Sequence, residues 1–438
     1  MVAAMTEQLD LFGDPPHAAI TDDPPQPAAT GTSIAAIADG TLPPDQSQRD
    51  IVTNQLGTTL FVEAGAGSGK TTALVQRVLH LVLAGVPIGS IAAITFTEKA
   101  AAELRVKIRE RLAQYAQQAT DAAQLALAHT ALGDLDTAPI GTLHAFARRL
   151  LNEFPVEAEL PPRFEVLDEV QSATAFHERF TDFLEALLDD PASVRLVELC
   201  QYDKFDVERG IRRMAEDFQA NWDLVHERVL PTPPPPADVA HHQRLLAAAC
   251  VTVGAHLPPD GDLQTAVRDQ FRDHAQAFAG ALPFGEFLRR LLAIQNTKYL
   301  KKGNTANWKK AHGGADMLAT FKADVTQAVH LAHEAIVQCN EERRLTIGAL
   351  LREFTLGSVQ ARREDGLLEF HDLLVLSRRM VTDHEGVRTQ LHHRYTHLLL
   401  DEFQDTDPIQ LELAVRISAP PDGQGADWRA LQPLPGRL

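Results

Sequence analysis

The chain has 438 residues, of which 45% are hydrophobic, so it can build two or three domains with cores of their own. Its three cysteines are widely spaced and include no Cys-x-x-Cys pair, which argues against a disulfide framework and a cysteine metal site. No apolar run reaches about 18 residues, and the N-terminus lacks a basic-then-apolar signal, so we expect a cytoplasmic protein without a membrane segment. The net charge of −18 leaves nucleic acids open as partners, because a groove lined with Lys and Arg binds phosphates even on an acidic protein.

Residues 1–40 are rich in Pro, Ala, Asp and Thr without sustained periodicity, a composition that predicts a disordered tail. One element in this tail, the segment Gln8–Phe12 with the sequence QLDLF, resembles the pentapeptide through which bacterial repair and replication proteins dock into the sliding clamp. An apolar pair in such a tail favours a binding role, and chance occurrence of a short motif is the alternative. The sliding clamp is therefore a candidate partner.

The next informative segment is an apolar strand end at Phe61 that runs into a glycine-rich turn and then a helix. Backbone N–H groups in such a turn wrap a β-phosphate, and the helix N-terminus adds its positive dipole end. Lys70 is expected to reach the β/γ oxygens and the Thr71 hydroxyl to ligate Mg²⁺. The pattern predicts a site for ATP with Mg²⁺, although its first position is Ala rather than Gly, and a structural glycine-rich turn is the alternative. The residues of this phosphate loop are Ala64, Gly65, Ala66, Gly67, Ser68, Gly69, Lys70, Thr71 and Thr72.

Downstream of the loop, apolar periodicity predicts an amphipathic helix over 73–84, a strand over 91–95 and a long helix that starts near Glu98. Residues of this last helix that should share one buried face are Leu104, Ile108 and Leu112. The alternation of strands and helices is typical of the first half of a doubly wound sheet.

A second carboxylate-bearing segment lies near the end of the chain. Residues 398–400 are three leucines and predict a buried parallel strand. We expect Asp401 to hold Mg²⁺ and Glu402 to act on the attacking water, with Gln404 placed to sense the γ-phosphate. Apolar strands that end in acidic residues are common, so this signal gains its weight from the pairing with Lys70.

Lys70 and Asp401 are too far apart in the sequence for a compact nucleotide domain, so an insertion must separate the two halves of the sheet. The expected fold is α/β, a P-loop NTPase (RecA-like) parallel-sheet domain with a large inserted all-helical domain. The expected domains are a disordered tail over 1–40, a motor domain made of 41–151 and 366–438, and an inserted helical domain over 152–365.

Six segments resemble, in order, the motifs of superfamily 1 DNA helicases of the UvrD/RecB/AddA kind. Residues 64–71 resemble motif I, and residues 401–406 resemble motif II. The other four are the glutamine motif at Gln48-Arg49, motif Ia at 95–101, motif Ib at 141–146 and the stretch before motif II at 368–374. The resemblance implies that Gln48 reads adenine and that ATP hydrolysis depends on Lys70, Glu402 and Gln404.

The resemblance also implies that two strand-to-helix turns face single-stranded DNA, with hydroxyls for phosphates and rings for bases. Thr97 and Thr142 have a simpler interpretation as caps of the helices that follow. His144 is equally well explained as a structural histidine. The residues that the resemblance assigns to DNA are Thr95, Phe96, Thr97, Thr142, His144 and Phe146.

The predicted insertion contains one basic cluster with interleaved aromatics, which is a candidate contact for single strands and for junctions of single- and double-stranded DNA. Its residues are Lys298, Tyr299, Lys301, Lys302, Trp308, Lys309 and Lys310. The alternative is a solvated loop with Trp308 tucked into the core.

By resemblance, the function is that of an ATP-dependent 3′–5′ DNA helicase or translocase in DNA repair and recombination, with ATP and Mg²⁺ as cofactors. In the family, motif II is followed by motif III and by a second motor domain that supplies arginine fingers. Because the chain ends at Leu438, before motif III, we expect very slow ATP hydrolysis or none. The alternative is a nucleotide- and DNA-binding module without unwinding activity, which works beside a second subunit.

Overall fold

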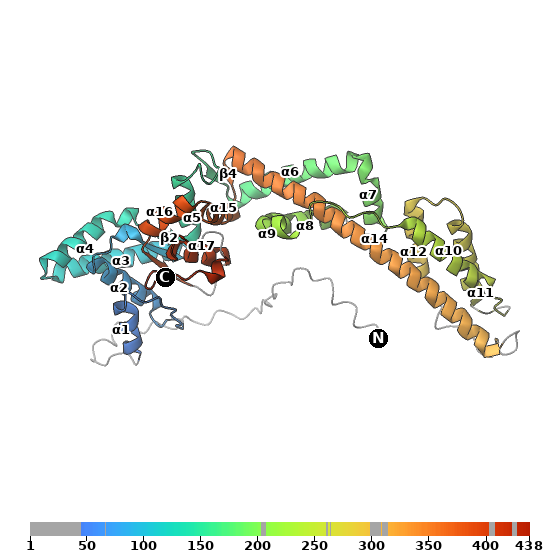
Figure 1. Cartoon of the computed structure of the whole chain (residues 1–438), viewed down its shortest axis with the longest axis horizontal. Coiled ribbons are helices and arrows are strands. Elements are labelled where there is room, and N and C mark those ends of the chain that lie inside the picture. Colours follow the sequence, from blue (N-terminus) through green and yellow to red (C-terminus); the bar gives the residue numbers. More distant parts are fainter. Residues whose placement is uncertain are drawn as a thin grey trace, which may run out of the picture.

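The computed structural model describes residues 45–65, 67–202, 207–259, 262, 264–297, 308, 314–402, 408–422 and 427–438. The predicted tail with its clamp-like segment, the lysines and Tyr299 of the basic cluster, Ala66 and Gln404 lie outside these residues. One end of the molecule holds a parallel sheet with its covering helices, and a long array of helices extends from it (Figure 1). We call the first part the sheet region (residues 45–166 and 367–438) and the second part the arm (residues 169–365).

The sheet has three parallel strands in the order β2-β1-β5. Their bounds are Ile91–Thr95 for β1, Ile140–Thr142 for β2 and His397–Leu400 for β5. The helices of this region are α1 (Gln46–Asn54), α2 (Lys70–Leu83), α3 (Glu98–Gln118), α4 (Ala122–Asp134), α5 (Leu143–Glu153), α15 (Phe370–Asp383), α16 (Glu385–Arg394) and α17 (Pro408–Ser418). Short 3₁₀ turns cover Ile88–Ser90, Leu135–Thr137 and Trp428–Ala430.

Alternate residues of β1 feed two cores, one on each face of the sheet. Ile91 and Ala93 pack with α2, α3 and α4, whereas Ala92 and Ile94 pack with α5, α15 and α17. All five residues of β1 are buried, as a central strand covered on both faces requires. The sequence-based predictions of strands at 91–95 and 398–400 and of a helix from Glu98 are confirmed, as is the buried face of that helix.

The predicted strand that ends at Phe61 is absent, since no strand is found among the described residues between α1 and α2. A strand forms only where its backbone groups find a partner, and the near edge of β5 is already engaged. Leu398 N–H donates to the Arg437 carbonyl at 2.8 Å, and Leu438 packs against the core beside it. The Phe61 side chain is consequently 76% exposed.

The arm is organised around α14 (Gly314–Asp365), a helix of 52 residues that spans about 78 Å. The helix contributes to three successive cores. Phe321 packs among α10, α11 and α12, Leu351 packs among α6, α7 and α8, and Val359 reaches the sheet-region core. The other arm elements are α6 (Glu169–Asp189), the 3₁₀ turn Pro191–Ser193, α7 (Val194–Gln201), α8 (Val207–Ala220), α9 (Trp222–Arg228), α10 (Val239–Ala255), α11 (Gln264–Phe278) and α12 (Phe284–Gln295).

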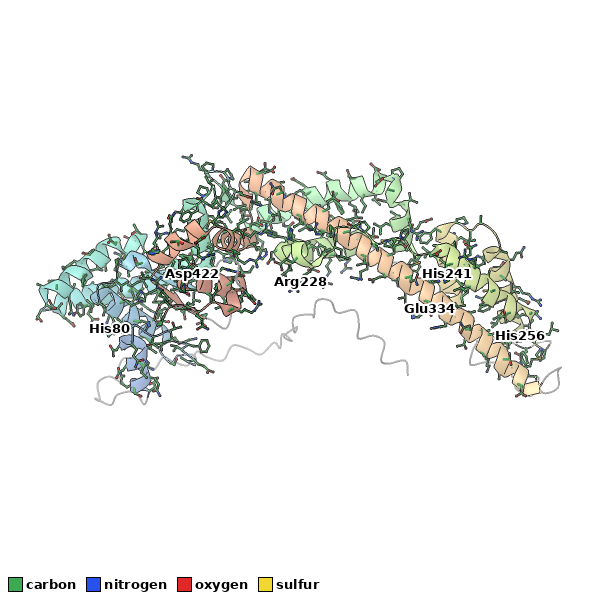
Figure 2. All side chains as sticks on the ribbon, viewed as in Figure 1. His80, Arg228, His241, His256, Glu334 and Asp422 are labelled. Carbon is green, nitrogen blue, oxygen red and sulfur yellow. The ribbon has the colours of Figure 1, made fainter. Side chains whose placement is uncertain are left out.

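Two histidine contacts illustrate how the ends of the molecule are held. His80 on α2 lies in the sheet region, with its Nδ1 2.9 Å from the Thr53 carbonyl of the loop-side helix α1. His256 lies near the far end of the arm, where its Nε2 is 2.6 Å from the Asp324 carboxylate on α14 (Figure 2). Every described helix is either too short or too polar to cross a bilayer.

The chain leaves the sheet region and returns to it at one point. The strands β3 (Glu165–Val166) and β4 (Leu367–Leu368) pair there in parallel. Gly366 has a φ of +69°, and a Cβ atom at this position would lie 2.7 Å from the Pro161 side chain, so the close crossing requires glycine. This crossing fixes the root of the arm.

Candidate nucleotide and DNA site

The phosphate loop has the left-handed backbone that its glycines allow. Gly67 has φ +75° and Gly69 has φ +92°, and Gly69 immediately precedes the first residue of α2. Ala64 is not among the residues with a positive φ, which explains why alanine is tolerated at the first position of the pattern. The Ser68 hydroxyl donates to the Gly65 carbonyl at 2.7 Å and tightens the turn.

Lys70 and Glu402 meet although they lie 332 positions apart in the sequence. Lys70 Nζ is 3.3 Å from Glu402 Oε2, and the two side chains are 29% and 38% exposed. Asp401 continues β5, because its N–H donates to the Ile94 carbonyl at 2.8 Å, and its Oδ1 accepts from the Glu402 N–H at 3.0 Å. Glu402 has φ +52°, a strained conformation that costs a non-glycine residue about 1–3 kcal/mol and that turns its carboxylate toward Lys70.

These charged groups line a cavity of about 690 Å³ together with apolar residues. Lys70, Asp401 and Glu402 form its polar part, and its apolar wall includes side chains of β5 and of residues 59–64. Carboxylate and hydroxyl oxygens are the donors that Mg²⁺ takes beside the phosphates of a nucleotide. The donor set at Asp401 and at Thr71, in the first turn of α2, therefore fits Mg²⁺.

Arg49 is a contact of the phosphate loop that the sequence-based site did not include. Its Nη2 donates to the Ser68 carbonyl at 2.5 Å, and a Cβ atom at Gly69 would lie 3.0 Å from Nη1. Asp45 holds the guanidinium from α1's N-terminal side at 2.9 Å. Gln48, the predicted adenine contact, is exposed on the same helix, and Ser47 donates to it at 3.3 Å.

Arg77 is a second contact that sequence reasoning missed. This side chain is 5% exposed and donates to the backbone carbonyls of α1 and the segment after it. The acceptors are Val52 at 2.7 Å, Gln55 at 3.2 Å, Leu56 at 3.5 Å and Thr58 at 3.2 Å. A signal was present, because Arg77 lies three residues after Leu74 and four before Leu81, on the apolar face of α2.

The two turns predicted to face DNA follow β1 and β2. Thr97 caps α3 by accepting from the Ala100 N–H at 3.1 Å, and Thr142 caps α5 by accepting from the Ala145 N–H at 3.2 Å. The capping interpretation is thus confirmed for both. Thr142 is also buried and donates to Glu98 at 2.7 Å, whereas Thr97 is exposed.

The aromatic residues of these turns differ in exposure. Phe96 is 62% exposed, so its ring is free to meet a base. Phe146 is 5% exposed and packs edge-on against Tyr395 at 5.1 Å, so its ring belongs to the core and offers no face to DNA. Thr95 is likewise buried, with its hydroxyl on the Thr97 carbonyl.

His144 lies between the two predicted sites. Its ring meets the edge of Phe370 at 5.5 Å, and burial lowers its pKa, as does the nearby His371. A small cavity of about 110 Å³ is lined by Phe96 and His144 from the turns and by Asp401 and Glu402 from the nucleotide side. The nucleotide carboxylates and the DNA-facing turns therefore adjoin at the carboxyl ends of the parallel strands.

Trp308 of the basic cluster is a core residue. It is 1% exposed and packs among α10, α11, α12 and α14, 6.0 Å from the Phe321 ring. The alternative interpretation of this tryptophan is confirmed, and it cannot stack on a base.

The family model for the UvrD/REP helicase N-terminal domain matches residues 45–422. The chain is similar to the A-type subunit of the ATP-dependent helicase/nuclease of Streptococcus mutans, with 24% identity over 83% of this chain and 32% of the relative. The protein of the same name from Levilactobacillus brevis is 26% identical over 85% of this chain and 33% of the relative. That of Lactobacillus gasseri is 36% identical over 32% of this chain and 11% of the relative. In the longer matches, the chain spans about a third of the length of these relatives.

Proposed function

The chain belongs to the UvrD/REP helicase N-terminal domain family, and on this premise we propose that it is the ATP-binding motor part of a DNA helicase or translocase that acts in repair and recombination. We propose 3′–5′ movement, ATP with Mg²⁺ as the energy source and single-stranded DNA as the track. Residues 41–151 and 366–438 would form the motor domain, residues 152–365 an inserted helical domain, and residues 1–40 a tail.

The observation that carries this proposal is the meeting of Lys70 with Glu402 at the carboxyl end of β5. A lysine at the start of a helix after a glycine loop, opposed by two carboxylates at a strand end, is the arrangement used for phosphoryl transfer to water. Lys70 and Glu402 pair across 3.3 Å, so each charge already has a partner within the site. ATP would take Lys70 for its β/γ oxygens and release Glu402 to accept a proton from water.

Each remaining residue has a role that follows from its position. Asp401 and Thr71 would hold Mg²⁺, which supplies neutralisation of the phosphate charge when bound. Backbone N–H groups of the loop would hold the phosphates, and Gln48 would contact adenine from α1. Gln404, outside the described residues, would sense the γ-phosphate.

The DNA would cross the turns after β1 and β2. Phe96 offers an exposed ring, Thr97 an exposed hydroxyl, and His144 a ring that borders the carboxylate cavity. A strand bound there would touch the same small cavity as Asp401 and Glu402, which supports a link between DNA binding and hydrolysis.

A second candidate is a nucleotide- and DNA-binding module that needs another polypeptide for unwinding. The relatives favour it, because they are named as subunits and because this chain spans about a third of their length. We propose a partner subunit on this basis. Docking to a sliding clamp through Gln8–Phe12 remains a proposal from the sequence.

The test is ATP hydrolysis by this chain with and without single-stranded DNA, with Lys70→Ala and Glu402→Gln as inactive controls. Strand displacement from substrates with a 3′ or a 5′ single-stranded tail then reports unwinding and its polarity. Turnover stimulated by DNA with displacement from the 3′ tail supports the helicase. Binding of both ligands without displacement supports the module, and failure to bind Mg-ATP refutes both.

A further inference from the structure

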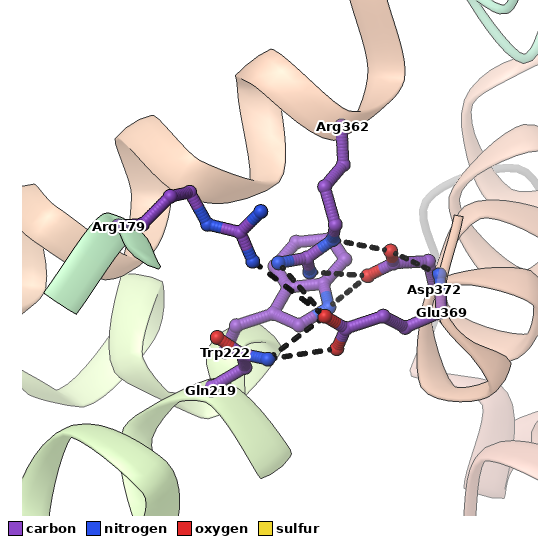
Figure 3. A network of polar contacts seen from close by, with 6 residues as sticks. All are labelled: Arg179, Gln219, Trp222, Arg362, Glu369 and Asp372. Carbon is purple, nitrogen blue, oxygen red and sulfur yellow. Dashed lines mark hydrogen bonds and ion pairs between the residues drawn. The ribbon is translucent and has the colours of Figure 1, made fainter. Parts of the chain in front are cut away.

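Two buried carboxylates at the root of the arm receive contacts from four arm helices. Glu369 and Asp372 lie on one short segment, at and just inside the start of α15 (Figure 3). Arg362 of α14 grips Asp372 with two parallel bonds, Nε to Oδ2 at 2.8 Å and Nη2 to Oδ1 at 2.9 Å. Trp222 of α9 donates its Nε1 to the same Oδ1 at 2.9 Å. Arg362 and Asp372 are 2% and 1% exposed, so this contact is closed to water.

The contacts of Glu369 are looser. Gln219 of α8 donates its Nε2 to Oε1 at 2.8 Å and to Oε2 at 3.0 Å. The two arginines stand further off, with Arg362 Nη1 at 3.5 Å and Arg179 Nη2 of α6 at 3.8 Å. Both nitrogens are buried and lack a hydrogen-bond partner within the described part of the chain. Charge-assisted bonds of this type normally close to about 2.7–2.9 Å, so each contact has room to shorten by close to an ångström.

The residues between the carboxylates connect this contact to the predicted DNA surface. Phe370 meets the ring of His144 edge-on at 5.5 Å. His371 places its Nε2 3.2 Å from Asp223 of α9, next to Trp222. Four consecutive residues, 369–372, thus touch the arm on one side and the turn after β2 on the other.

We propose that Glu369 and Asp372 are positioning residues that set the angle of the arm, and that the angle is coupled to DNA at the turn containing His144. The Asp372 contact is the pivot, because any displacement there would leave a buried arginine without its counter-ion. The Glu369 contact is the adjustable side, because its two arginines can approach. DNA that presses on His144 and Phe370 would shift the segment, and α14 would carry that shift along its 52 residues. The DNA-coupling part of this inference rests on the proposed function.

The arm angle can be measured without nucleotide or DNA. Cysteines at Glu110 of α3 and Gln327 of α14, both exposed, would carry a donor and an acceptor dye for single-molecule energy transfer. The three native cysteines are buried, which favours labelling of the new sites. We expect one narrow efficiency peak for the parent and a shifted or broadened peak for Asp372→Asn.

A matched control lies inside the arm. Arg195 and Glu342 form an equally close pair, with Nε to Oε1 at 2.6 Å and Nη2 to Oε2 at 2.9 Å, away from the root. Glu342→Gln should weaken the arm's interior yet keep the parent peak. Gln219→Ala removes one neutral contact and serves as the milder joint variant should Asp372→Asn fail to fold.

Addition of a single-stranded oligonucleotide then tests the coupling. It should move the parent peak, and Asp372→Asn, or Gln219→Ala in its place, should weaken oligonucleotide binding about fivefold or more while Glu342→Gln does not. A joint variant that keeps both the parent peak and the parent affinity would overturn the inference. If no protein binds DNA, the proposed DNA function fails and the coupling with it, while the peak positions still decide whether the carboxylates set the angle.

Discussion

Replacing Lys70 with alanine should separate nucleotide binding from folding. The Lys70 side chain is 29% exposed and its partner Glu402 is 38% exposed, with 3.3 Å between Nζ and Oε2. An ion pair that wet contributes at most about 1 kcal/mol to the free energy of unfolding, so Lys70→Ala should unfold almost like the parent. A charge-assisted contact to phosphate contributes about 1.5–3 kcal/mol, which corresponds to Mg-ATP binding about 10- to 150-fold weaker.

Calorimetric titration with Mg-ATP gives the affinity, and urea denaturation gives the stability. Lys107 on α3 is exposed, so Lys107→Ala is the control for loss of one positive charge and should bind like the parent. Glu402→Gln releases Lys70 from its carboxylate, and binding should persist or tighten. Parent affinity in Lys70→Ala would refute the site, and a loss of stability well above 1 kcal/mol would show that its effect on binding is indirect.

Three further predictions follow from the contacts of the sheet region. Arg77→Ala should lower the free energy of unfolding by about 2–3 kcal/mol, because it strips four backbone carbonyls of their donor, whereas Arg109→Ala on the surface should change it little; equal denaturation midpoints would contradict this. Gly69→Ala should weaken Mg-ATP binding, since φ +92° strains alanine and its Cβ meets Arg49, and unchanged titrations would count against the loop geometry. Burial lowers the pKa of His144 and of His397, so the unfolded chain binds protons more readily, and the stability these groups contribute above their usual pKa of about 6.5 should fall as the pH drops below it. Denaturation at pH 7.5 and 5.5 checks this, and equal or greater stability at pH 5.5 would contradict it.

Elements with a strong local pattern were predictable from the sequence. The strand at 91–95 and the leucine strand at 398–400 are apolar runs, which only a buried strand accommodates at that length. Periodicity placed the buried face of α3 because one helical face must cover the sheet. The glycines of the loop identified its turn because the backbone there takes positive φ.

Contacts between distant segments were not predictable. Phe61 has the pattern of a strand end, yet a strand depends on a free edge, and the edge of β5 is engaged by Arg437. Phe146 sits in the same kind of turn as Phe96, and only packing against Tyr395 shows that its ring faces inward. The joint at Asp372 joins Trp222, 150 positions away, so no local periodicity reveals it.

The most direct test of the account is the linkage between Mg-ATP and single-stranded DNA on this chain. Fluorescence anisotropy of a labelled oligonucleotide would give its affinity with and without Mg-ATP, and titration of Mg-ATP with and without the oligonucleotide would give the reverse. Because the carboxylates and the DNA-facing turns share one cavity wall, we predict that each ligand changes the affinity of the other by the same factor. Lys70→Ala should remove the effect. Two ligands that bind independently, or a chain that binds neither, would contradict the account.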